Sequence, residues 1–162
     1  MKKYPLVFLV VILLMFSGCV PNNSKEERAD VSSFFENINA SFSASFGELE
    51  TKGYFTFTPE TLSLEFTFPK TISGLRINVN NQSVSLSFNG LSVTKENSSV
   101  TEKFNAFAVY SVLNRARLDG LLNKTDSKTA ITGDGFEIML DGENRVSKIL
   151  IPEKRINIEL EW

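Results

Sequence analysis

The residues that could do chemistry are few in this chain. Its 162 residues include no His and one Cys, Cys19. His-based catalytic triads and most zinc, copper and haem sites are therefore excluded, because they need imidazole or several thiolates. The net charge of −2 and the pI of about 5.3 argue against nucleic acid as a partner, since proteins that bind it are normally basic. The composition thus predicts no cofactor, no metal and no nucleic-acid partner.

The N-terminal segment suggests a role for the single thiol. Lys2 and Lys3 precede an apolar run over residues 6–16, which is too short to span a bilayer comfortably and is typical of an export signal. The run leads into Ser17-Gly18-Cys19. These small residues before a lone Cys resemble the lipobox of bacterial lipoproteins, in which the chain is cut before the Cys and its thiol receives diacylglycerol. The resemblance implies a lipid anchor at Cys19, with palmitate-type acyl chains.

This interpretation divides the chain into three parts. Residues 1–18 are the expected lipoprotein signal peptide, residues 19–28 the lipidated Cys and a polar tether, and residues 29–162 a single domain. The alternatives are a signal anchor that is never cut, or an ordinary signal peptide in which the Cys follows by chance. Lipidation also accounts for an odd Cys in an exported protein. We therefore expect an extracytoplasmic protein that is lipid-anchored to a bacterial membrane, either the cell membrane or an outer membrane.

Four carboxylates lie close together in the sequence, at Asp134, Glu137, Asp141 and Glu143. Such a group could serve as a glycosidase pair or as a calcium loop. However, Asp-Gly is ordinary turn chemistry, and the ligand spacing of an EF-hand is absent. A nucleophile without His would need Lys as its base, and no Ser-x-x-Lys pattern stands in a helical context. We expect structural roles for these residues and no enzymatic activity.

Aromatic and aliphatic residues are the remaining candidates for a functional site. The chain has 14 Phe, and a flat ring offers a large apolar area that suits an acyl chain. The alternative is that these side chains only pack a core. The predicted ligand-binding residues are Phe55, Phe57, Leu64, Phe66, Phe68, Ile77, Leu86, Phe88, Phe104 and Phe107.

Most of these residues lie in segments that alternate apolar and polar positions. Alternation with a period of two is typical of strands with one wet face. The predicted strands cover residues 42–46, 54–58, 62–68, 75–79, 84–88, 91–93, 129–132, 136–140, 146–151 and 156–162. Turn-forming residues separate neighbouring segments, so consecutive strands should be antiparallel. The pattern therefore predicts a meander of about nine or ten strands.

Two segments have helical spacing instead. Residues 25–37 begin near a capping Ser24 and carry Val31, Phe34, Phe35 and Ile38 on one stripe, which usually faces a core. A second helix begins at the capping box Ser99-Val-Thr-Glu102, and its expected buried face holds Phe104, Phe107, Ala108, Ser111 and Val112. The polar residues 119–128 that follow are expected to form a loop.

A sheet of this length must coil, and its apolar face must be covered. We therefore predict an α+β fold with one strongly curved antiparallel sheet, an unclosed half-barrel, whose concave face is covered by helices. The segments 53–59 and 64–69, which each end in Pro, the hairpin at 84–90 and the helix that follows resemble the LolA/LolB lipoprotein-carrier superfamily in order and pattern. That resemblance implies the same kind of curved sheet plugged by helices.

Two functions fit these features. The first is a non-catalytic carrier or acceptor, which holds a hydrophobic or lipidic ligand, such as an acyl chain, in a sheet-helix cavity at the membrane. The second is a cell-envelope interaction module with a filled core and an envelope protein as its partner. A solvent-accessible apolar cavity distinguishes the first from the second.

Overall fold

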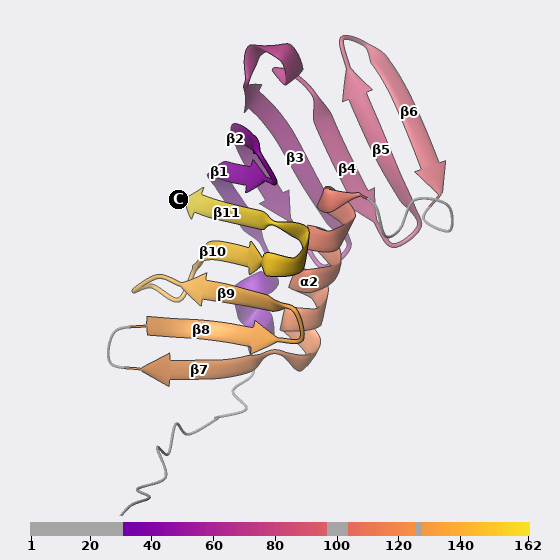
Figure 1. The fold of residues 1–162 in the computed structure, drawn as a ribbon. Coiled ribbons are helices and arrows are strands. Elements are labelled where there is room, and N and C mark those ends of the chain that lie inside the picture. Colours follow the sequence, from indigo (N-terminus) through magenta and orange to yellow (C-terminus); the bar gives the residue numbers. More distant parts are fainter. Residues whose placement is uncertain (1–30, 97–103, 126–127) are drawn as a thin grey trace, which may run out of the picture.

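The computed structural model describes residues 31–96, 104–125 and 128–162. They form one sheet of 11 antiparallel strands with a single α-helix, α2 (Asn105–Asp119), against one face (Figure 1). The short helices η1, η2 and η4 cover Ser32–Phe35, Lys70–Ile72 and Pro152–Lys154. The strands are β1 (Ile38–Phe46), β2 (Leu49–Phe57), β3 (Thr61–Phe68), β4 (Arg76–Asn80), β5 (Ser83–Phe88), β6 (Leu91–Glu96), β7 (Leu121–Thr125), β8 (Lys128–Gly133), β9 (Phe136–Leu140), β10 (Val146–Ile151) and β11 (Ile156–Glu161).

The strands form two meanders that meet in the middle of the sheet. The spatial order is β6-β5-β4-β3-β2-β1-β11-β10-β9-β8-β7, so the first and last strands are neighbours and β6 and β7 are the two open edges. The pairing of β1 with β11 runs from Ser41 opposite Glu161 to Phe46 opposite Ile156. Strand direction turns strongly between β7 and β6, as expected for a sheet that twists over many strands (Figure 1). The predicted curved, unclosed antiparallel sheet is confirmed, but as two meanders instead of one.

All ten predicted strands are present, and the structure adds one. The eleventh, β7, lies at residues 121–125, where a loop was predicted. Its sequence, Leu-Leu-Asn-Lys-Thr, does not alternate, so periodicity gives no signal for it. It forms because β8 pairs with it over five residues, from Leu121 opposite Thr132 to Thr125 opposite Lys128.

The predicted N-terminal helix is wrong in its described part. Only a single turn, η1, forms there, and Ile38 already begins β1. The alternation that starts at Ile38 and continues through Phe42 explains this, because it fits a strand better than a helix. Val31, Phe35 and Ile38 are nevertheless buried, as a core-facing stripe requires, and η1 packs against α2. Residues 25–30 and Ser24 lie outside the described residues.

The helix α2 is present, but it faces the sheet with a different side. Five of its six buried residues form one face, which consists of small or aliphatic side chains and one aromatic ring: Ala106, Val109, Tyr110, Leu113 and Ala116. At 100° per residue, the predicted face lies on the opposite side of the helix, and of its members only Val112 is fully buried. Apolar residues occur on both sides of this helix, so the larger Phe side chains misled the prediction. The capping box at 99–102 lies outside the described residues, and the N-cap is Phe104.

Candidate functional site

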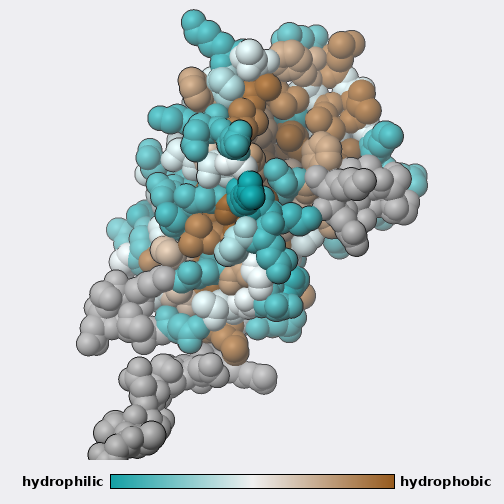
Figure 2. All heavy atoms as spheres, in the orientation of Figure 1, coloured by the Kyte–Doolittle hydropathy of each residue, from teal (hydrophilic) through white to brown (hydrophobic). Residues whose placement is uncertain are grey.

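An apolar cleft opens between the sheet and the first turn of α2. Its volume is about 320 Å³, near the lower end of the roughly 300–1,000 Å³ range of small-molecule sites. Nine of its ten lining residues are apolar, and Asn105 is the polar one. In the space-filling view, hydrophobic side chains gather in the upper part of the molecule, where β3 to β6 lie in Figure 1 (Figure 2). The lining residues are Phe46, Leu49, Leu64, Phe66, Ile72, Leu75, Ile77, Phe104, Asn105 and Ala106.

The floor of the cleft is built by strand alternation. Leu64 and Phe66 on β3 are buried, and Ile77 on β4 lies directly opposite Leu64. The Phe66 ring packs edge-on against Phe42, with ring centroids 5.7 Å apart. The Phe42 ring in turn lies close to Gly53, where an added Cβ would be 2.9 Å from the ring and would clash with the backbone oxygen of Glu65. Gly53 thus lets β2, β3 and an aromatic ring approach closely behind the cleft.

A β-bulge decides which aromatic residues reach the cleft. Gly53 pairs with Phe66 but Lys52 pairs with Phe68, so Thr67 is an extra residue in β3. The bulge turns Phe68 to the outer face beside Lys52, where half of its surface is exposed. The interpretation of Phe68 as an inward-facing ligand residue is therefore wrong.

The structure brings four of the ten predicted ligand residues to the cleft: Leu64, Phe66, Ile77 and Phe104. Phe55 and Phe57 face the same side of the sheet but are completely buried in the core, so they do not reach the cleft. Leu86 and Phe88 are half-buried on β5, beyond the cleft, and Leu86 packs against the core. Whether any of these residues binds a ligand stays a prediction.

Phe107 differs from the prediction as well. It lies on the less buried side of α2, with its ring 6.3 Å from that of Tyr110, and it is not among the cleft residues. It therefore does not cover the cleft as the expected helix face implied. The N-terminal turn of α2, with Phe104 and Ala106, does so instead.

Six of the ten lining residues are not among the predicted ligand residues. Two of the six are Leu75, directly before β4, and the polar Asn105, which begins α2. The other four fall into two kinds. Phe46 and Leu49 flank the β1-β2 turn, Ile72 lies in the connection after β3, and Ala106 is a small residue on α2. The first three stand at strand ends or in a loop, where alternation carries no information. Ala106 could have been found only from the correct helix face, because its small side chain contributes space and little apolar area.

A buried hydroxyl fixes α2 over the sheet. Tyr110 Oη lies 3.2 Å from the Pro59 carbonyl oxygen, 3.3 Å from that of Glu60 and 3.3 Å from Asn81 Oδ1. These acceptors belong to the β2-β3 and β4-β5 turns. Burial, aided by the nearby Glu60 carboxylate, raises the pKa of the Tyr110 hydroxyl, although Asn114 and Arg117 oppose the shift. The hydroxyl therefore keeps its single proton, which it donates to one of these acceptors at a time.

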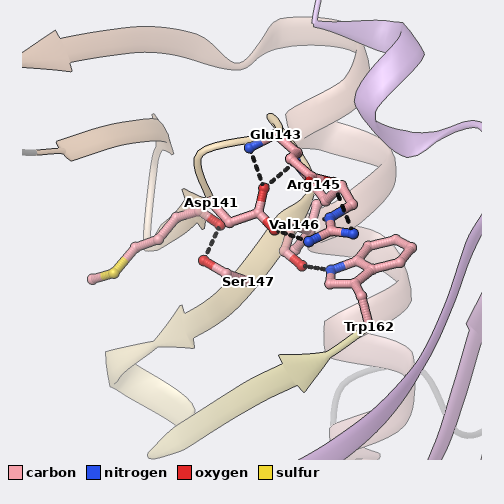
Figure 3. Close-up of polar contacts among 7 residues, drawn as sticks. Asp141, Glu143, Arg145, Val146, Ser147 and Trp162 are labelled. Atoms are coloured by element: carbon pink, nitrogen blue, oxygen red, sulfur yellow. Dashed lines mark hydrogen bonds and ion pairs between the residues drawn. The ribbon is translucent and has the colours of Figure 1, made fainter.

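Two of the four carboxylates considered as chemical candidates, Asp141 and Glu143, are engaged in turn structure (Figure 3). Asp141 Oδ1 accepts hydrogen bonds from the backbone N–H groups of Glu143 and Arg145, both at 2.9 Å. The Arg145 guanidinium binds Asp141 Oδ2 at 2.8 Å and Glu143 Oε2 at 3.0 Å, and it lies over the Trp162 ring. Trp162 Nε1 donates to the Val146 carbonyl oxygen at 2.9 Å. The cluster ties the end of the chain after β11 to the β9-β10 turn.

The Asp141 carboxyl has a shifted pKa. Desolvation acts to raise this pKa, but the backbone N–H of Arg145, its guanidinium and the N–H of Glu143 together lower it below its ordinary value. Asp141 is therefore ionised at neutral pH, with its oxygens occupied by these donors. Within the described part of the chain, no group of three or more His, Cys, Asp or Glu residues could hold a metal ion.

Comparisons with known proteins find structural likeness only. No protein family and no curated protein matches the sequence. An uncharacterized conserved protein from Thermus thermophilus aligns with a TM-score of 0.48 at 11% identity, over 81% of this chain and 80% of its own. A LolA superfamily protein from Nitrosomonas europaea aligns with a TM-score of 0.37 at 12% identity, over 79% of this chain and 74% of its own. At these scores, the likeness carries no argument about ligand, partner or membrane attachment.

No helix among the described residues is both long and apolar enough to cross a membrane.

Proposed function

We propose that this protein is a membrane-anchored extracytoplasmic lipoprotein that binds a hydrophobic or lipidic ligand without catalysing a reaction. The observation that supports it is the cleft of about 320 Å³ with a single polar lining residue, Asn105. An alkyl chain gains about 0.8 kcal/mol for each CH₂ that it buries, and no charged group in the lining would lose its hydration. The competing interaction module requires a filled core, and an open apolar cleft of this size argues against one.

Ala106 provides a direct test of ligand binding. It is buried, lines the cleft and leaves the space beside Leu64 and Phe66 open. Ala106→Leu should fill part of the cleft and weaken saturable binding of a fluorescent fatty-acid probe at least tenfold. Ala108→Leu is the matched control, because it makes the same change on the half-exposed side of the same helix, and it should bind like wild type.

Native mass spectrometry of the purified full-length protein complements this test. A copurified lipid in wild type, reduced in Ala106→Leu, would support the carrier function. Absence of saturable binding in all three proteins, with intact circular dichroism spectra, would remove it and leave the interaction module.

The membrane anchor is a separate part of the proposal. It depends on the signal-like segment and on Cys19, which precede the described residues. Cys19→Ala should leave an uncleaved or mislocalised precursor that no longer incorporates labelled palmitate. Unchanged processing and unchanged membrane partition of this variant would contradict lipidation.

A further inference from the structure

The apolar surface of the cleft does not end at its rim. Leu64 on β3 lies opposite Ile77 on β4, Ile77 opposite Leu86 on β5, and Leu86 opposite Val93 on β6. These four residues form one straight row across four strands, from the cleft floor to the open edge of the sheet. Directly opposed residues share a face of the sheet, so the row is continuous on the side that α2 covers.

A second row runs beside the first. The Phe66 N–H donates to the Leu75 carbonyl oxygen at 2.9 Å, and Phe88 on β5 pairs with Leu91 on β6. Leu75 and Phe88 are neighbours because β4 and β5 are antiparallel, so the residue before Arg76 lies beside the residue after its partner Ser87. We call the two rows together the apolar track: Leu64, Ile77, Leu86 and Val93 in the first row, and Phe66, Leu75, Phe88 and Leu91 in the second.

Exposure rises steadily along the track. Leu64 is 1% exposed and Phe66 5%, Ile77, Leu75, Leu86 and Phe88 are half-buried, and Val93 and Leu91 are 58% and 76% exposed. In Figure 1, β5 and β6 extend beyond α2, and Figure 2 shows hydrophobic side chains gathered on this part of the face. A core needs no apolar residues at its most exposed edge, whereas a surface that guides an apolar molecule into the cleft does.

The other face of the same strands is polar, so the apolar residues of β5 and β6 are confined to the face that α2 covers. Ser85 opposes Thr94 and Ser87 opposes Ser92, with the two Oγ atoms of the latter pair 3.4 Å apart. The next row on the apolar side ends in Lys95, which lies opposite Val84 at the β6 edge. Lys95 therefore ends the apolar track along β6, and hydroxyl groups occupy the opposite face of the sheet.

We infer that the ligand is an amphiphile whose alkyl chain is longer than the cleft, and that this chain lies along the apolar track and leaves the protein at the β6 edge. This inference rests on the proposed function and adds to it the path and the length of the ligand. Leu75 and Ile77 at β4 already line the cleft. Neighbouring strands are about 4.8 Å apart, so the two steps from β4 to β6 add about 10 Å of apolar surface beyond the cleft. Continuity with the cleft favours an alkyl chain over a protein partner, because the same chain can cover both surfaces.

Photocrosslinking to the full-length protein in nanodiscs tests the path. Two eighteen-carbon fatty acids are compared, one with a diazirine near the methyl end and one with a diazirine near the carboxylate. The methyl-end probe should label residues of the cleft, such as Phe66 and Ile77. The carboxylate-end probe should label the β5-β6 hairpin around Leu91 and Val93.

A double variant tests the energetic contribution of the track. In the double variant Leu91→Ser, Val93→Ser, an unlabelled eighteen-carbon acid should compete with the fluorescent fatty-acid probe about fivefold more weakly. The effect is moderate because an alkyl chain that the protein covers on one side only gains roughly half of the full burial free energy. Competition by an eight-carbon acid, which the cleft alone can hold, should not change. Leu118→Ser removes another exposed Leu, 68% exposed on α2 outside the track, and should leave both acids unaffected.

The outcomes separate this inference from the proposed function. If neither probe labels the cleft, ligand binding itself fails. If the cleft is labelled but the carboxylate-end probe labels another rim, or if the double variant weakens both acids equally, the track is overturned. It is also overturned if wild type is a dimer by analytical ultracentrifugation that the double variant converts to a monomer with no change in competition.

Discussion

At the scale of single residues, the position of Phe66 shows how local irregularity sets the cleft. Phe66 and Phe68 have the same type and the spacing of one strand face, yet the bulge at Thr67 sends Phe66 inward and Phe68 outward. Phe66→Ala should lower the free energy of unfolding by about 3–5 kcal/mol, because it removes a buried ring that packs on Phe42. Thr67→Ala should change it by no more than about 0.5 kcal/mol, as an exposed position does. Urea melts would measure both, and equal losses would contradict the register.

Asp141 provides a prediction with a defined pH dependence. The pKa of this carboxyl is lower in the folded protein than its ordinary value, so its contribution to stability is complete above that ordinary value and disappears as pH falls through the folded value. Asp141→Asn should lower the free energy of unfolding by about 1 kcal/mol at pH 7. It removes the charge from the group that accepts the hydrogen bonds of this partly exposed turn. The stability difference between wild type and variant should shrink as pH falls below the ordinary value of 3.8 and through the lower folded value.

Glu50→Gln is the charge-matched control for Asp141. Glu50 is an exposed residue of β2, so its replacement should leave the stability curve close to wild type at every pH. Denaturant melts at several pH values would measure all three proteins. A difference between wild type and Asp141→Asn that grows toward low pH would contradict the direction of the pKa shift.

At the scale of secondary structure, one hydroxyl ties α2 to two turns of the sheet, in addition to the buried apolar face of the helix. Tyr110→Phe keeps the ring contacts with Phe57 and Phe107 but leaves the acceptors on two turns without their donor. Tyr110→Phe should therefore lower the free energy of unfolding by about 1–2 kcal/mol. Tyr54→Phe, which removes an exposed hydroxyl on β2, should cost almost nothing. Thermal melts would compare the two variants, and equal shifts in Tm would show that the hydroxyl does not hold the helix.

The raised pKa of Tyr110 gives this interaction an alkaline limit. Its stabilising contribution is complete below the ordinary pKa of about 10 and is lost as pH rises through the higher folded value. Wild type should therefore lose part of its advantage over Tyr110→Phe at strongly alkaline pH.

The strands could be predicted well and the helices poorly, for a physical reason. Alternation in segments such as residues 62–66 reports directly on a sheet with one wet face. The orientation of α2 could not be derived, because Phe104 and Phe107 on one side compete with Val109 and Leu113 on the other, and only the sheet decides. The β7 strand forms by pairing with β8, and that pairing leaves no periodic signal in its own sequence.

The candidate site could be predicted only in part, because bulges and chain connections shape it. Leu64 and Ile77 follow from alternation. The outward turn of Phe68 depends on the extra residue Thr67, and the contribution of Ile72 depends on a connection between strands. The track needs the cross-strand register of β3 to β6, which no single segment encodes.

At the scale of the whole molecule, the pairing of β1 with β11 joins the two meanders into one unit. Ile158 on β11 is fully buried between Ala44 on β1 and Ile149 on β10. Ile158→Ala should cost about 2–5 kcal/mol and lower hydrogen-exchange protection in both meanders together. Val84→Ala, a substitution in β5 near one edge, should have its largest effect on β4 to β6. Loss of protection in β9 and β10 alone after Ile158→Ala would mean that the meanders unfold independently.

The same central pairing gives the fold a circular strand order. Ser41 lies opposite Glu161, so the chain enters the sheet next to the point where it leaves it. A chain with residues 162 and 31 joined by a linker, and opened instead between β6 and α2, would keep every strand pair in the same register and would retain η1 with the buried Val31 and Phe35. Such a circular permutant would carry its two ends beside the β6 edge and the first turn of the helix, next to the cleft. The protein could then be attached to a surface from its opposite side without any change in its core.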